Sequence, residues 1–190
     1  IIGEEGTRRF FKGAVFDGPY NTPVRPYARS ARWALEYQLH QPHYQMLKEG
    51  HYRGYKQGGY ISKMLSATIS GMARYSTLDP RPDDADDALV VAKKAVEYLL
   101  KISEPAGAPM ENFPPTYYLE PGEKPAFEFW EERADGVVMM IYPAVVGMAY
   151  LDLYDVTGDA QYLAAATHIA DTYGKTQRED GTWPLTARLA

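Results

Sequence analysis

An internal repeat of 74 to 76 residues limits the folds that this chain can adopt. The sequence Gly71-Met72-Ala73 returns 76 positions later as Gly147-Met148-Ala149, and 89–103 aligns without gaps to 163–177, 74 positions later. Each repeat holds one segment that is apolar nearly all round and one segment with a single apolar face. Such a pair is typical of a helical hairpin, and repeated hairpins build solenoids or closed rings.

Two amphipathic segments, 84–103 and 159–177, are predicted to be the outer helices of these hairpins. Their apolar residues recur at i, i+3 and i+4, while charged residues such as Lys93 and Lys94 fall on the opposite face. Before the second helix, Thr157-Gly158-Asp159 predicts a left-handed glycine turn followed by an aspartate N-cap. Asp83 and Asp84 are predicted to cap the first helix and to supply its acidic first turn.

Two segments without a polar face, 61–75 and 137–154, are predicted to be the inner helices. The second carries only Asp152 as a charge, so we expect it to be covered on every side, with Val145 and Met148 buried. Pro143 should either kink this helix or mark the start of its regular part. We predict that helices 61–76 and 137–156 are adjacent and that 84–102 and 159–176 pack outside them.

The fold class expected from these segments is all-α, an (α/α) toroid of helical hairpins that is incomplete in this chain. With a further amphipathic helix at 26–39, the chain holds about five helices, whereas a closed ring of six hairpins needs twelve. We assign residues 26–190 to this partial toroid domain. Residues 1–25 form an irregular N-terminal segment, with a short strand expected near 8–16.

Composition excludes several classes of function. The 20 Lys and Arg residues are scattered among 25 Asp and Glu residues, so the chain lacks the basic stripe that nucleic acids require. No run of about 18 apolar residues would span a membrane. The absence of cysteine excludes disulfides and cysteine-bound zinc, and it leaves both periplasm and cytoplasm open.

No metal or other cofactor is expected. His40, His43 and His51 have no metal-binding spacing, because a proline breaks the helical phase between the first two and no HExxH pattern occurs. His168 falls on the boundary face of an outer helix and is expected to be structural. The four aspartates within 83–87 lack the spacing of a calcium loop, and we interpret them as a solvated helix start.

Candidate catalytic residues are expected in the loops that lead from outer to inner helices, because these loops lie on one face of a ring of hairpins. Asp135 is the first candidate, at the point where the long aromatic loop 104–135 enters a buried helix. Burial would raise the pKa of its carboxyl group and the helix dipole would lower it, and a plain N-cap is the alternative role. The aromatic loop is expected to be ordered, with Trp130 partly exposed beside Asp135 and with Arg133 nearby.

Two other loops hold candidate substrate-binding residues. The run Gln177-Arg178-Glu179-Asp180-Gly181-Thr182-Trp183 would place the Trp183 indole at the mouth of the ring, or it would act as a structural clamp between repeats. The glycine-rich run Tyr55-Lys56-Gln57-Gly58-Gly59-Tyr60 lacks P-loop spacing. It fits close backbone packing before an inner helix as well as it fits substrate contact.

The stretch 135–182 resembles the six-hairpin glycosidases, most closely the unsaturated glucuronyl hydrolases. The carrying motifs are Ala134-Asp135-Gly136-Val137-Val138-Met139-Met140 with Pro143, Leu153-Tyr154-Asp155-Val156-Thr157-Gly158-Asp159, Ala165-Ala166-Thr167-His168-Ile169-Ala170 and Arg178-Glu179-Asp180-Gly181-Thr182. By this resemblance Asp135 is the general acid and base. It would protonate the enol-ether double bond of an unsaturated uronic acid and direct water to the neighbouring carbon.

The function expected is therefore that of a glycoside hydrolase acting on uronic-acid oligosaccharides, with Asp135 catalytic. Substrate-binding roles are expected for Tyr55, Lys56, Gln57, Trp130, Arg133 and Trp183. A polysaccharide lyase or sugar epimerase on the same scaffold is an alternative, in which Tyr55, Lys56 and Arg133 would supply the base and the cation. A non-catalytic helical-repeat module that binds glycan or protein is a second alternative.

Overall fold

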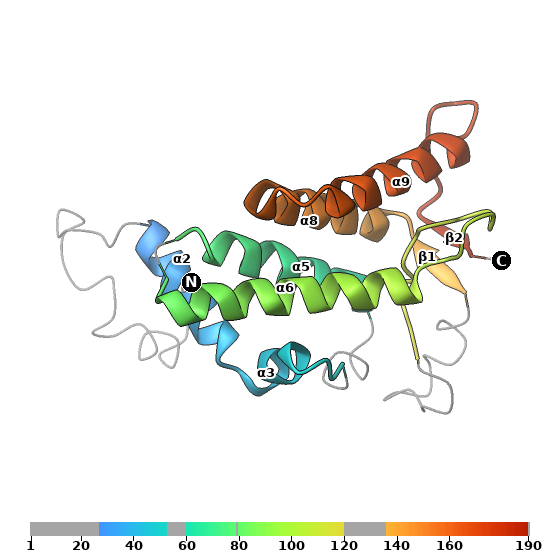
Figure 1. The fold of residues 1–190 in the computed structure, drawn as a ribbon. Helices are drawn as coiled ribbons and strands as arrows, with labels where there is room; N and C mark the ends of the chain where they lie inside the picture. The colour runs from blue at the N-terminus through green and yellow to red at the C-terminus, as the bar shows by residue number, and fades with distance from the viewer. Residues whose placement is uncertain (1–26, 53–59, 79, 120–135, 190) are drawn as a thin grey trace, which may run out of the picture.

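The computed structural model describes residues 27–52, 60–78, 80–119 and 136–189 (Figure 1). This part of the chain is mostly helical, as the sequence predicts. Along the chain its elements are α2 (Tyr27–Leu39), α3 (Pro42–Lys48), α5 (Ile61–Tyr75), α6 (Pro82–Ile102), β1 (Val137–Met139), α8 (Ile141–Thr157), α9 (Ala160–Thr176) and β2 (Thr186–Arg188). The irregular segment and the short strand expected within residues 1–25 lie outside the described residues. The amphipathic helix expected at 26–39 is α2.

The four long helices form two hairpins that lie side by side. Helix α5 packs along α8, α6 packs against α5, and α9 packs against α8 (Figure 1). This is the predicted adjacency of the two inner helices, with one outer helix on each. The fully buried core includes Leu65, Ile69 and Met72 of α5 and Val91, Ala95 and Leu99 of α6.

The turn between α8 and α9 forms as the sequence predicts. Gly158 has a φ of 68°, in the left-handed region where a Cβ atom would be strained. Asp159 is the N-cap of α9, and its Oδ1 accepts a hydrogen bond of 3.1 Å from the Gln161 amide. Within α8, a Cβ atom added to Gly147 would lie 3.5 Å from Ile169 of α9, an ordinary van der Waals contact, so this position faces α9.

The start of α6 differs from the prediction. Its N-cap is Arg81, and Pro82 occupies the first turn, where a missing N–H costs nothing. Asp84 is only 6% exposed: it accepts a hydrogen bond of 3.2 Å from the Tyr75 hydroxyl and lies 3.3 Å from His40 Nε2. The interpretation of this aspartate as a solvated cap is wrong, because burial and two polar partners make it a link between helices. Burial and the carboxylate raise the pKa of Tyr75 to about 12.

Residues 137–139 are a strand, whereas the sequence predicts helix from residue 137. Strand β1 pairs antiparallel with β2, with Val138 opposite Ala187, so the last residues of the chain add backbone hydrogen bonds that periodicity does not reveal. Helix α8 begins at Ile141, and Pro143 lies in its first turn, where its missing N–H would have no partner within the helix. Pro143 therefore lies at the start of the regular helix and does not kink it.

Helix α3 is an element that the sequence analysis does not predict. The break at Pro42 is real, but the proline begins a second helix directly after α2. Leu47 of this helix is fully buried, and Lys48 lies 2.5 Å from Asp87 of α6. Helix α3 therefore packs on the outer side of the α5–α6 hairpin.

Helix α8 is not covered on every side. Ile141, Val145, Met148 and Leu151 are all exposed, whereas Pro143, Val146, Ala149, Tyr150 and Leu153 are buried. The expectation that Val145 and Met148 are buried is therefore wrong, although Lys93 is exposed as predicted. Two sides of α8 face α5 and α9, and one apolar face remains open to solvent.

Candidate functional site

The first turns of the two inner helices lie at the same end of the molecule, the end that carries β1 and β2 (Figure 1). Thr116, a fully buried residue, forms hydrogen bonds with the starts of both helices. Its carbonyl accepts a hydrogen bond of 3.0 Å from the Ile61 amide at the start of α5, and its Oγ1 accepts one of 2.7 Å from the Met139 amide before α8. Ser62 Oγ donates to the neighbouring Pro115 carbonyl at 2.5 Å. The loop after α6 thus fixes both helix starts.

Three tyrosine rings gather at this end and form what we call the tyrosine cluster: Tyr60, Tyr117 and Tyr142. The Tyr60 ring lies 5.1 Å from that of Tyr117 and 5.7 Å from that of Tyr142, measured between centroids. Tyr117 is 7% exposed, whereas Tyr60 and Tyr142 are half-buried and reach the surface. Flat aromatic faces with polar rims suit contact with a sugar ring.

Tyr60 has an unusual backbone conformation. As the residue before α5 it has a φ of 50° and a ψ of 41°, in the left-handed region that a bulky residue rarely occupies. Such strain costs about 1–3 kcal/mol and often marks a functional position. Lys63, one turn into α5, places its Nζ 5.9 Å from the centre of the Tyr60 ring. The cluster therefore has an ammonium group at its edge, which would attract a carboxylate.

The chain enters β1 through Gly136. Gly136 has a φ of 64°, and its carbonyl accepts a hydrogen bond of 2.7 Å from the Leu189 amide. The Met140 amide donates to the Leu185 carbonyl at 3.0 Å. The segment 185–189 therefore holds the start of α8 in place from outside.

Most of the predicted site residues lie outside the described residues. These are Asp135, Tyr55, Lys56, Gln57, Trp130 and Arg133, and their predicted catalytic and binding roles stay predictions. The alternative role of Asp135 as the N-cap of the inner helix is wrong, because strand β1 follows and Met140 is the N-cap of α8. The described part of the aromatic loop is ordered, because the Glu104 amide bonds the Phe113 carbonyl at 3.0 Å and the Phe113 ring is fully buried.

Trp183 is the one predicted binding residue within the described part of the chain. Its indole N–H donates to the Tyr173 carbonyl at 3.0 Å, and the two rings meet edge to face with centroids 5.7 Å apart. Tyr173 in turn donates to the Met140 carbonyl and accepts a bond of 3.1 Å from the Ala144 amide, and burial raises its pKa to about 12. These contacts tie the loop to α8 and α9, which belong to one repeat, so the role of this loop as a clamp between repeats stays a prediction. The predicted contact of Trp183 with substrate stays a prediction.

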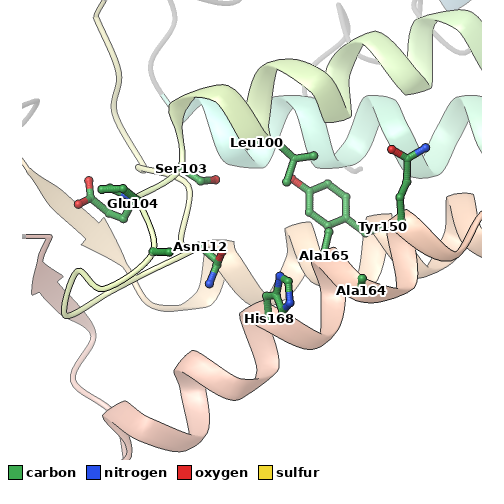
Figure 2. Close-up of a pocket in the computed structure, with 11 residues that line it drawn as sticks. Leu100, Ser103, Glu104, Asn112, Tyr150, Ala164, Ala165 and His168 are labelled. Atoms are coloured by element: carbon green, nitrogen blue, oxygen red, sulfur yellow. The ribbon is translucent and has the colours of Figure 1, made fainter.

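A separate pocket of about 430 Å³ lies between α6 and α9 (Figure 2). Tyr150 of α8 forms part of its lining, and His168, Asn112 and Glu104 contribute polar side chains. Burial raises the pKa of the Glu104 carboxyl group. The Tyr150 hydroxyl is buried without a hydrogen-bond partner among the described residues, and burial raises its pKa. The pocket is therefore lined in part by a tyrosine whose buried hydroxyl is unsatisfied.

Replacing Tyr150 with phenylalanine is expected to raise the free energy of unfolding by about 1 kcal/mol, because an unpaired buried hydroxyl is removed. The matched control is Tyr75→Phe, which removes a hydroxyl that is bonded to Asp84 and should lower the free energy of unfolding by about 1–2 kcal/mol. Urea unfolding of both variants gives the comparison. Equal losses in the two variants would contradict the unpaired state of Tyr150.

The described residues hold no group of three His, Asp or Glu side chains that would bind a metal ion. Across the same residues, no helix has the length and apolar character needed to cross a membrane. Comparisons with models of protein families, with curated proteins and with solved structures found no match.

The tyrosine cluster is not among the site residues predicted from sequence. Tyr60 is noted there only as the end of a glycine-rich run, and Tyr117 only as one aromatic of a long loop. Tyr142 gives no signal, because it lies inside an apolar helix. A partial signal is the position of Tyr60, directly before an inner helix and after two glycines.

Proposed function

We propose that this chain is a carbohydrate-active enzyme, a glycoside hydrolase that acts on unsaturated uronic-acid oligosaccharides by general acid/base catalysis. The observation that carries the proposal is the tyrosine cluster at the shared end of α5 and α8. A sugar ring would lie on Tyr60 and Tyr142, and Lys63 would pair with its carboxylate. The scaffold proposed is an (α/α) toroid of hairpins.

In this proposal Asp135 exchanges the proton. It precedes Gly136, and the resemblance to unsaturated glucuronyl hydrolases assigns the acid and base to this position. The carboxylic acid would protonate the enol-ether double bond, and the resulting carboxylate would accept a proton from the attacking water. A lyase or epimerase would instead need a base with a cation near the uronate, which Tyr55, Lys56 and Arg133 would supply.

A non-catalytic glycan-binding module is the second candidate. It is favoured by the composition of the described part of the site, where two half-buried tyrosines, Tyr60 and Tyr142, and the exposed Lys63 reach the surface. One assay distinguishes the hydrolase from the binding module. The chain is incubated with an unsaturated uronide disaccharide, and the ultraviolet absorbance of the disaccharide is measured over time. Loss of absorbance supports the hydrolase. Saturable binding with unchanged absorbance would exclude hydrolysis and support the binding module.

Replacing Tyr142 with alanine is expected to raise the KM for the uronide by about three- to tenfold, because an aromatic contact contributes about 0.5–1.5 kcal/mol. The matched control is Tyr37→Ala on α2, where the side chain is 66% exposed, and it should leave KM unchanged. Initial rates over a range of substrate concentrations test both variants. An unchanged KM for Tyr142→Ala would remove the tyrosine cluster from the substrate site.

A further inference from the structure

The internal repeat allows a direct comparison of the two inner helices. At an offset of 76 residues, Leu65, Ile69 and Met72 of α5 correspond to Ile141, Val145 and Met148 of α8. The three residues of α5 are all 0% exposed. Their counterparts in α8 are 59%, 38% and 67% exposed, in the same order. Equivalent apolar positions are therefore covered in one repeat and open in the other.

The open residues of α8 form one continuous surface. Ile141, Val145, Met148 and Leu151 follow at intervals of four, three and three residues, so they lie on a single helix face. We call this face the α8 stripe. Large apolar side chains that are grouped on a surface mark an interaction site.

The interface between α5 and α8 indicates what covers such a stripe. Helix α8 packs along α5, and both helices start at the same end of the molecule (Figure 1). The buried side of α8 holds Val146, Tyr150 and Leu153, which are apolar or aromatic. A further repeat would place its inner helix on the α8 stripe in the same way that α8 lies along α5. That helix would carry apolar or aromatic residues at the positions of Val146, Tyr150 and Leu153.

We propose that the α8 stripe is the docking surface for another helical hairpin of the same repeat. The inner helix of that hairpin runs parallel to α8 and presents residues that correspond to Val146, Tyr150 and Leu153. Asp155, which is exposed at the C-terminal end of the stripe, disfavours contact with an anionic membrane surface. The proposal rests on the repeat and on exposure, so it is independent of the proposed catalytic activity.

A thiol-labelling experiment tests the proposal, because the chain contains no cysteine. In Met148→Cys the single thiol is expected to react freely in the 190-residue chain. A tandem chain is then made by joining a second copy of residues 117–189 after Ala190, which keeps the 74-residue register. There the thiol at position 148 should react at least about tenfold more slowly, since labelling requires local opening. The control is Lys93→Cys on α6, whose labelling rate should be equal in the two chains.

Three results would overturn the proposal. The first is equally fast labelling of the thiol at position 148 in both chains, together with circular dichroism that shows a helical added unit. The second is an added unit that stays unfolded, because the α8 stripe would then fail to hold a repeat of its own kind. The third is a dimer of the 190-residue chain in sedimentation that Met148→Glu dissociates, which would assign the α8 stripe to a second copy of this chain.

Discussion

Replacing Asp135 with asparagine is expected to lower kcat for an unsaturated uronide by about 10²–10⁴-fold, the usual cost of losing general acid/base catalysis. Asparagine has nearly the size of aspartate and still accepts a hydrogen bond, but it does not exchange a proton with the substrate. Folding should be little affected, because Met140 and not Asp135 is the N-cap of α8, and the substitution keeps the size of the side chain. Turnover and melting temperature are measured on the same preparations.

The two proposed roles of Asp135 give different results in this experiment. A catalytic aspartate predicts an inactive protein with a normal melting temperature. A purely structural aspartate predicts activity within a few-fold of the unmodified chain. The second result would remove Asp135 from the mechanism, and with it the main reason to prefer a hydrolase over a lyase or an epimerase.

Replacing Met72 with alanine is expected to lower the free energy of unfolding by about 2–5 kcal/mol, because the side chain is fully buried and its removal leaves a cavity. The matched control is Met148→Ala, the same substitution at the equivalent position of the next repeat. There the side chain is 67% exposed, so the change should stay within about 0.5 kcal/mol. Urea denaturation of the two variants under identical conditions measures both values.

Similar losses in the two methionine variants would contradict the structure at one of two places. If both are large, Met148 is covered in solution, and the size of the chain in sedimentation shows whether a second copy covers it. If both are small, α5 does not lie in a packed core. The pair therefore tests the difference between the repeats without reference to any activity.

The parts of the fold that follow from local chemistry could be predicted from the sequence. The turn at Gly158 and the cap at Asp159 depend on neighbouring residues only, and both formed as expected. The adjacency of α5 and α8 followed from the repeat, because equivalent helices occupy equivalent positions.

Features that depend on distant residues could not be predicted in the same way. Asp84 resembles a solvated cap until Tyr75 and His40 are seen to cover it. Strand β1 forms because residues 186–188 lie beside it, and no periodicity at 137–139 indicates that partner. Apolar periodicity showed that α8 has apolar residues on all sides, but it does not show which side a neighbour covers.

The same distinction holds for the candidate site. The motif at 177–183 draws attention to Trp183, whose described contacts are with Tyr173 of α9, and its role toward substrate stays a prediction. The tyrosine cluster combines Tyr60, Tyr117 and Tyr142 from three separate segments, and only their packing brings the rings together.

The bond from Met139 to Thr116 and the β1–β2 ladder also bear on the order of folding. The hairpins α5–α6 and α8–α9 rest on contacts between neighbouring segments, which form early because little chain entropy is lost. By contrast, β1 and β2 enclose the whole α8–α9 hairpin between them, so their pairing has to wait until that hairpin has formed. We therefore expect the tyrosine cluster, which depends on Thr116 and the start of α8, to assemble last during refolding. In pulsed hydrogen exchange, the Met139 amide, which donates to Thr116, should then gain protection more slowly than helical circular dichroism appears.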